Sequence, residues 1–207
     1  MSNGGSPSDQ DRREYFRVND AVRLTLRKVA NDEMPGLLQR LDHNITGNFT
    51  VMSSLAAISA EMAASMRRIE NGNPDIAAYL KALDRKIETL GRAFIASDSE
   101  LMAEEAHAVN LSAGGMGTLV NDAYEPGQVV EIKMLLFPSF TGVLTYGTVV
   151  DCVPIDAQES REDYGYRMRI EFTHMREQDR DLVIRHVLRC QSNELRKKDP
   201  AHRLEED

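Results

Sequence analysis

The sequence predicts an α+β protein in which a long helical hairpin interrupts a series of β-strands. Apolar, β-branched and aromatic runs, each bounded by Gly, Pro, Asp or Asn, indicate the strands. After the first of these runs, apolar residues recur at steps of three, four or seven, which is the period of a helix. We therefore expect a sheet domain that is split in sequence by a helical insertion.

The predicted strands lie near the N-terminus and in the second half of the chain. They are expected at Ala21–Val29, Met116–Val120, Gln128–Pro138, Gly142–Pro154 and Tyr164–Thr173. A helical run from about Arg176 to Lys197 follows and should close the domain. The expected organisation is a disordered arm at 1–11, a split domain at 12–30 and 106–198, the insertion at 31–105 and a flexible tail at 199–207.

The insertion predicts two long helices. The first, Leu37–Ile69, has an apolar seam at Leu41, Ile45, Met52, Leu55, Met62, Met66 and Ile69. The sequence Asn71-Gly72-Asn73-Pro74 then supplies a C-terminal glycine, an N-cap asparagine and a first-turn proline. The second helix has a heptad seam at Ile76, Leu80, Leu83, Ile87, Leu90 and Phe94.

The short link between these helices predicts an antiparallel hairpin that associates with other copies. At 1.5 Å per residue the first helix would be roughly 50 Å long and would have to project. Two helices alone cannot cover both seams, so we expect a dimer or tetramer formed through residues 37–95. The alternative is a hairpin folded back on its own domain. Asn48 and Ser59 could fix the register of the first seam, and Gly47 could loosen its helix.

Composition and charge narrow the class of protein. At 207 residues and 42% hydrophobic, the chain can bury one ordinary core and a smaller appended unit. A formal net charge of -8 argues against general nucleic-acid binding, which needs a broad basic surface. No apolar stretch approaches the ~20 residues that span a bilayer, and no signal-peptide pattern is present. Cys152 and Cys190 are expected to be buried free thiols, so we expect a cytoplasmic protein.

Two short segments carry the candidate binding residues. The first contains the pattern Arg-x-x-x-Arg in the cluster Arg12, Arg13 and Arg17. The second contains the pattern Asn-x-Ser-x-x-Gly in Asn110, Ser112, Gly114 and Gly115. Arginines offer permanent charge, forked donors and flat faces that stack on purines, while the glycines permit positive backbone torsions and close approach of a ligand. These groups suit an anionic ligand that carries guanine.

In this order, and followed by these strands and this helix, the two patterns resemble the signature of the PilZ domain, the bacterial receptor module for cyclic di-GMP. The resemblance covers roughly residues 9–30 and 106–198 and implies an antiparallel β-barrel with a C-terminal helix. It also implies that Arg13 and Arg17 grip an intercalated pair of ligand molecules and that Arg12 adds a phosphate contact.

The same resemblance assigns the second segment. Asn110 and Ser112 would face a guanine, and Gly115 would be the closing glycine. The family prefers Asp where this chain has Asn110, a difference that bears on affinity more than on function. Tyr15 and Phe16 are expected to pack beside the barrel.

Two expectations concern the surroundings of this site. Arg167 and Arg169 share one strand face, which is either the ligand face or plain solvent-exposed surface. Because the arm before Arg13 is polar, we expect it to become ordered on binding and to bias the angle between barrel and hairpin.

Catalytic and metal-binding patterns are not evident. The run Gly114-Gly115-Met116-Gly117 lacks the rest of a P-loop, and Ser112 does not lie in Gly-x-Ser-x-Gly. His43, His107, His174, His186 and His202 show no His-x-x-x-His pair and no cysteine at ligand spacing, so we expect no metal site. We also expect no enzyme activity and no cofactor. The expected function is a cyclic di-GMP receptor; the alternatives are a PilZ adaptor that binds no nucleotide and a structural coiled-coil protein.

Overall fold

The barrel is the centre of the fold. The structure, a computed structural model, describes residues 16–43, 48–96, 105–155 and 164–198. Within these ranges, antiparallel strands form a closed barrel in the order β1-β2-β3-β6-β5-β4. The strands are β1 (Val18–Lys28), β2 (Ala106–Ser112), β3 (Gly115–Val120), β4 (Val129–Leu136), β5 (Thr141–Pro154) and β6 (Tyr166–His174). The antiparallel barrel implied by the family resemblance is therefore confirmed.

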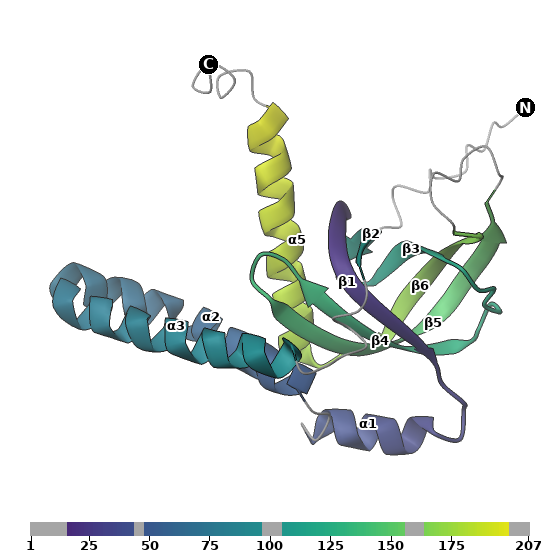
Figure 1. The fold of residues 1–207 in the computed structure, drawn as a ribbon, viewed down its shortest axis with the longest axis horizontal. Coiled ribbons are helices and arrows are strands. Elements are labelled where there is room, and N and C mark those ends of the chain that lie inside the picture. The colour runs from purple at the N-terminus through teal and green to yellow at the C-terminus, as the bar shows by residue number, and fades with distance from the viewer. Residues whose placement is uncertain (1–15, 44–47, 97–104, 156–163, 199–207) are drawn as a thin grey trace, which may run out of the picture.

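The helices lie outside the barrel. They are α1 (Met34–Asp42), α2 (Asn48–Gly72), α3 (Pro74–Ala96) and α5 (Glu177–Lys198). Figure 1 shows α2 and α3 as an antiparallel hairpin that projects from the barrel, with α5 rising beside the barrel from the base of that hairpin. The projecting hairpin and the closing helix are both as predicted. Among the described residues, no helix combines the length and the apolar character needed to cross a membrane.

The first helix of the insertion is not continuous, contrary to the prediction. α1 ends at Asp42, and the backbone N–H of His43 bonds back to the carbonyls of Gln39 and Leu41. Leu41 is buried beneath the barrel, so α1 packs against the barrel instead of extending the hairpin. Residues 44–47, with Ile45 and Gly47, lie outside the described ranges. α2 alone has 25 residues, which at 1.5 Å per residue is a length of roughly 37 Å.

Two apolar clusters hold these parts together. The larger fills the barrel with residues such as Val22, Leu111 and Met168, and Val183 and Val187 of α5 belong to it. α5 therefore seals the barrel core. The smaller cluster joins α1, the base of α2 and strands β4 and β5 through Val29, Leu41, Met52, Leu135, Leu144 and Tyr146. The hairpin is thus anchored at its base while its far end projects.

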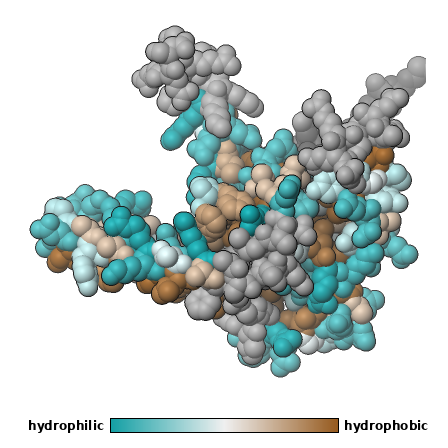
Figure 2. Space-filling view, viewed as in Figure 1, coloured by the Kyte–Doolittle hydropathy of each residue, from teal (hydrophilic) through white to brown (hydrophobic). Residues whose placement is uncertain are grey.

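The hairpin packs internally through small residues. Ala77 is buried, and Gly91 lies so close to Met52 that an added Cβ would fall 2.3 Å from the Met52 sulfur. Large seam residues of α3, such as Leu83 and Leu90, remain exposed instead, from 36% at Leu83 to 63% at Leu90, and Tyr79 beside the seam is 67% exposed. Figure 2 shows hydrophobic side chains, in brown, along the projecting hairpin. The expectation that two helices leave apolar surface uncovered is confirmed.

Candidate ligand-binding face

Five residues form a row across the outside of the barrel. The strand register places Asn19 of β1 opposite Asn110 of β2, Asn110 opposite Gly117 of β3, and Gly117 opposite Arg169 of β6. Arg169 is in turn opposite Asp151 of β5. Paired residues of a sheet point to the same side, so these five lie next to one another. We call Asn19, Asn110, Gly117, Arg169 and Asp151 the cross-strand row.

Both ends of the row are hydrogen-bonded. Arg17 Nη1 donates to Asn110 Oδ1 at 3.3 Å, and Asn110 Nδ2 donates to Asn19 Oδ1 at 2.8 Å. At the other end, Arg169 Nε donates to a carboxylate oxygen of Asp151 at 2.7 Å. This hydrogen bond lowers the pKa of Asp151. The structure therefore brings together Arg17 and Asn110, one residue from each predicted motif.

A pocket of about 410 Å³ opens over the row. Arg17, Arg167 and Arg169 all line it, so the strand face whose role the sequence left open is part of the candidate site. Gly117 lies at the centre of the row. A Cβ at Gly117 would make only ordinary contacts, the nearest being Met168 O at 3.8 Å. The fold thus tolerates a side chain here, and glycine leaves the floor of the pocket open to a flat ligand.

The segment Ser112–Gly115, which we call the motif turn, faces inward more than expected. The Ser112 hydroxyl is buried and donates to the Gly115 carbonyl at 3.0 Å, so its predicted guanine contact stays a prediction. The backbone N–H of Phe172 donates to the Gly114 carbonyl at 2.9 Å. A Cβ at Gly115 would lie 2.3 Å from Ile170 O, and Gly115 does not adopt a positive φ. Glycine is needed at Gly115 for the close approach of β6 rather than for a positive torsion.

Some predicted site residues fall elsewhere. Arg12, Arg13 and Tyr15 lie outside the described residues. Phe16 is 68% exposed, so its expected packing beside the barrel is wrong in this structure. The sequence analysis also missed Asn19 and Asp151, because only the strand register places them in the row.

A polar cluster around the buried His186 joins β1 to α5. Ligand-type atoms of Asp20, His186 and Cys190 lie within 4.8 Å of one another. His186 and Cys190 are four residues apart on α5, so the statement that no cysteine lies at ligand spacing from a histidine is wrong. Cys152 and Cys190 are free thiols that are half-buried rather than fully buried, and desolvation raises the pKa of Cys190.

The hydrogen bonds of this cluster fit a structural histidine better than a metal ligand. An Arg189 guanidinium N–H lies 3.1 Å from His186 Nδ1, and a guanidinium can only donate. Nδ1 is therefore the acceptor, and Nε2 carries the proton toward Asp20 Oδ2 at 2.5 Å. Both ring nitrogens are engaged, so the cluster ties α5 to β1 without a lone pair directed at a metal.

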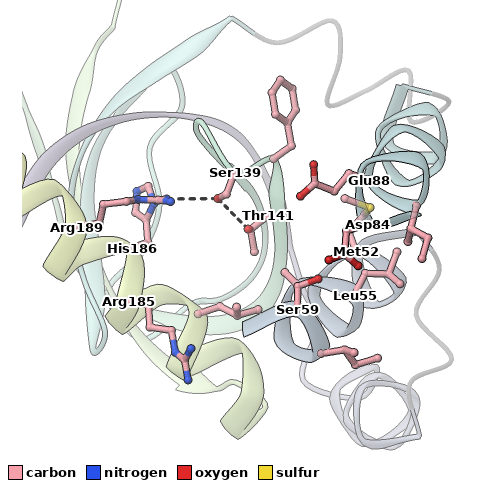
Figure 3. A pocket seen from close by; sticks show the side chains of 15 residues that line it. Met52, Leu55, Ser59, Asp84, Glu88, Ser139, Thr141, Arg185, His186 and Arg189 are labelled. Carbon is pink, nitrogen blue, oxygen red and sulfur yellow. Dashed lines mark hydrogen bonds between the residues drawn. The ribbon is translucent and has the colours of Figure 1, made fainter. Parts of the chain in front are cut away.

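A second pocket, of about 430 Å³, lies where the hairpin meets α5. Figure 3 shows Asp84 and Glu88 on its hairpin side, Arg185 and Arg189 on its α5 side, and Ser139 between them. Its hairpin wall also includes exposed apolar residues from both helices, Ile58 of α2 and Ile87 of α3. The apolar surfaces of α2 and α3 therefore open onto the same side of the hairpin.

Comparison with known families identifies the barrel. The family model described as the PilZ domain matches residues 84–189, slightly more than half of the chain. The chain belongs to the PilZ domain family. The matched stretch holds β2 to β6, with Asn110, Ser112 and Gly115, while Arg17 lies before it.

Two solved structures are similar to this PilZ protein. One is a pathogenic protein from Xanthomonas campestris, described as a new tetrameric PilZ domain self-assembled via an unusual helical bundle. It is 14% identical, with a TM-score of 0.54, and the match covers 88% of this chain and 91% of that one, which shows a shared fold. The other is the inhibitor of motility of Bacillus subtilis, with 20% identity, a TM-score of 0.37 and 44% of each chain covered. Curated proteins gave no match.

Proposed function

We propose that this PilZ protein is a receptor for cyclic di-GMP that relays the level of this second messenger through an oligomeric helical bundle. Proteins of this family act as receptors or adaptors rather than enzymes. The observation that carries the proposal is the cross-strand row, where Arg17 is hydrogen-bonded to Asn110 on the face that also holds Arg167 and Arg169. The receptor would act in the cytoplasm and would need no cofactor.

The proposed binding mode uses each part of the row. Arg13 and Arg17 would grip the guanines and phosphates of the ligand, with Arg12 as a further phosphate contact. The Asn110 amide would pair with a guanine edge, and Gly117 would let a base lie flat on the strand. Ordering of the arm would bring the exposed Phe16 ring against ligand or barrel, which changes the surface that a partner meets.

The test is calorimetry with cyclic di-GMP and the Arg17→Ala variant. A hydrogen bond to a charged group contributes about 1.5–3 kcal/mol, so the variant should bind roughly ten- to a hundredfold more weakly. Arg85→Ala, an exposed arginine on α3, is the matched control and should bind like wild type. Wild type that gives no heat would contradict the receptor proposal and favour the alternative, a PilZ adaptor that acts through protein contacts alone.

The second part of the proposal is self-association through the hairpin into a dimer or tetramer. Its support is the exposed apolar stripe of α3, formed by Ile76, Tyr79, Leu83, Ile87 and Leu90. Monomeric proteins rarely expose a contiguous apolar patch of more than a few hundred Å², and larger patches mark interaction sites. The Xanthomonas protein of similar fold is tetrameric through a helical bundle, which fits the same use of the hairpin here.

A further inference from the structure

The first turn of α5, together with Arg176 directly before it, contacts both the motif turn and the base of the hairpin. Arg180 Nη1 donates to the carbonyl of Ala113 at 2.8 Å. One helical turn earlier, Arg176 Nη2 donates to Ser53 Oγ of α2. Gln178 Nε2 adds a longer bond, 3.4 Å, to Ser54 Oγ. The start of α5 thus bridges the motif turn and the base of the hairpin.

At the ligand side, Arg180 holds a buried part of the motif turn. Ala113 is 3% exposed, and its carbonyl accepts the Arg180 bond. In a trans peptide the C=O and the following N–H point in opposite directions, so this bond also sets the direction of the Gly114 N–H. Arg180 therefore fixes one backbone donor of the segment that contains Asn110, Ser112 and Gly115.

At the hairpin side, Arg176 is part of a buried charge pair. Arg176 Nε lies 2.7 Å from Asp179 Oδ2, and both side chains are almost fully buried, as is Ser53. Moving one member of a buried pair away from its partner is costly, because it leaves an uncompensated charge. The three groups are therefore expected to move together when the base of α2 shifts.

The backbone links the two ends tightly. The N–H groups of Asp179 and Arg180 both bond to the Arg176 carbonyl, each at 3.0 Å. A displacement of Arg176 is thus transmitted through one helical turn to Arg180, with no flexible segment between them.

We propose that Arg176 and Arg180 are positioning residues that couple the packing of the hairpin to the conformation of the motif turn. This coupling rests on the function proposed above. If cyclic di-GMP binds at the motif turn, hairpin assembly and ligand affinity become linked. Such linkage is reciprocal, so ligand binding shifts the hairpin by the same free energy. This route runs through α5 and is independent of ordering of the N-terminal arm.

A double-mutant cycle tests the coupling. Ser53→Ala removes the hydroxyl that Arg176 contacts, and Arg180→Gln removes the bond to Ala113. Each is expected to weaken cyclic di-GMP binding by roughly two- to thirtyfold, the range found for residues that couple sites without touching ligand. In the double variant, Ser53→Ala should cause no further loss of affinity beyond that of Arg180→Gln, because the contact between α5 and the motif turn is already absent. Losses that simply add would overturn the proposal.

Ser65→Ala is the matched control. It makes the same change on α2, where Ser65 Oγ accepts from Arg68 at 2.9 Å, away from α5. It should leave ligand affinity unchanged. Arg180→Lys keeps one donor and should recover part of the loss seen with Arg180→Gln. A Ser65→Ala loss equal to that of Ser53→Ala would show a general effect on α2 and overturn the proposal.

Amide exchange without ligand separates this coupling from the receptor proposal. The Gly114 and Gly115 amides should exchange several-fold faster in Ser53→Ala and Arg180→Gln than in wild type or Ser65→Ala. Exchange in the barrel core, for example at Ile132, should be unchanged. Wild type that fails to bind cyclic di-GMP would defeat the receptor proposal alone. Unchanged exchange at Gly114 and Gly115 in both variants would overturn the coupling, whether or not the ligand binds.

Discussion

The outer face of the barrel and the outer face of the hairpin are both exposed, but they are built differently. The cross-strand row consists of polar groups that already bond to one another, such as Arg17 with Asn110 and Arg169 with Asp151. The α3 stripe consists of large apolar side chains such as Tyr79 and Leu90, which are more than 60% exposed. Within a single folded chain, the polar groups of the row find hydrogen-bond partners, whereas the apolar side chains of the stripe remain exposed to solvent.

This contrast indicates different partners for the two surfaces. Convergent donors around an open floor fit a small anionic ligand, whose groups can replace the internal hydrogen bonds one by one. An apolar stripe with heptad spacing fits another helix, because only a helix offers the matching period. Substitutions in one surface should therefore leave the function of the other surface unchanged, apart from the coupling that we propose through α5.

The largest expected effect is loss of assembly on charging the stripe. The double change Leu83→Asp and Leu90→Asp places carboxylates on the stripe and should convert the oligomer to a monomer at tens of micromolar. Light scattering coupled to size exclusion measures this, and the barrel should still bind ligand. Arg85→Asp introduces a carboxylate at a polar position of the same helix and should stay oligomeric. A monomeric wild type would refute the proposed bundle.

The next effect separates the two glycines of β3. Gly115→Ala places a Cβ against the Ile170 carbonyl and should destabilise the barrel by about 1–3 kcal/mol, a typical cost of overpacking. Since 1 kcal/mol corresponds to roughly 2–4 °C for a chain of this size, thermal unfolding will resolve it. Gly117→Ala should keep the wild-type melting temperature and lower ligand affinity, because its Cβ makes only ordinary contacts with the protein and would stand on the floor of the pocket. Equal melting temperatures for the two variants would contradict this assignment.

The smallest effect concerns the ion pair of the row. In the proposed complex Asp151 would compete with the anionic ligand for Arg169, so Asp151→Asn should tighten cyclic di-GMP binding a few-fold. The pKa of Asp151 lies below its ordinary value, so the pair stays intact at neutral pH. It is lost only as the pH falls through that lowered pKa. Calorimetry that finds weaker binding in Asp151→Asn would show that Arg169 does not contact the ligand.

Local patterns predicted much of this molecule. Alternation and breakers placed every barrel strand except β2 to within a few residues, and Asn71-Gly72-Asn73-Pro74 placed the hairpin turn between Gly72 and Pro74. The seam residues of α3 were also recognised, because heptad spacing needs no knowledge of the rest of the fold. The family resemblance assigned Arg17 and Asn110 to one site, and the structure brings these two residues together, while their contact with a ligand stays a prediction.

Several misses depend on distant contacts, whereas the spacing of His186 and Cys190 is local and was overlooked. Asn19 and Asp151 join the row through strand register, which no single strand sequence specifies. The break after Asp42 arises because Leu41 finds a buried place under the barrel, which outweighs the helical period that runs through it. Arg176 and Arg180 gain their roles only where α5 meets two other segments.

The position of the insertion determines how freely the inserted helices can vary while the barrel stays the same. The insertion leaves from β1 and returns into β2, which are neighbouring strands paired in the barrel, with Arg23 opposite Ala106. The β1–β2 pairing therefore keeps the two ends of the insertion near each other, independently of the helices. The entropy of closing a loop grows only with the logarithm of its length, about 0.6 kcal/mol for each doubling. The projecting part of the hairpin can therefore differ in length with little change in barrel stability, provided that Leu41 and Met52 keep their buried places against the barrel.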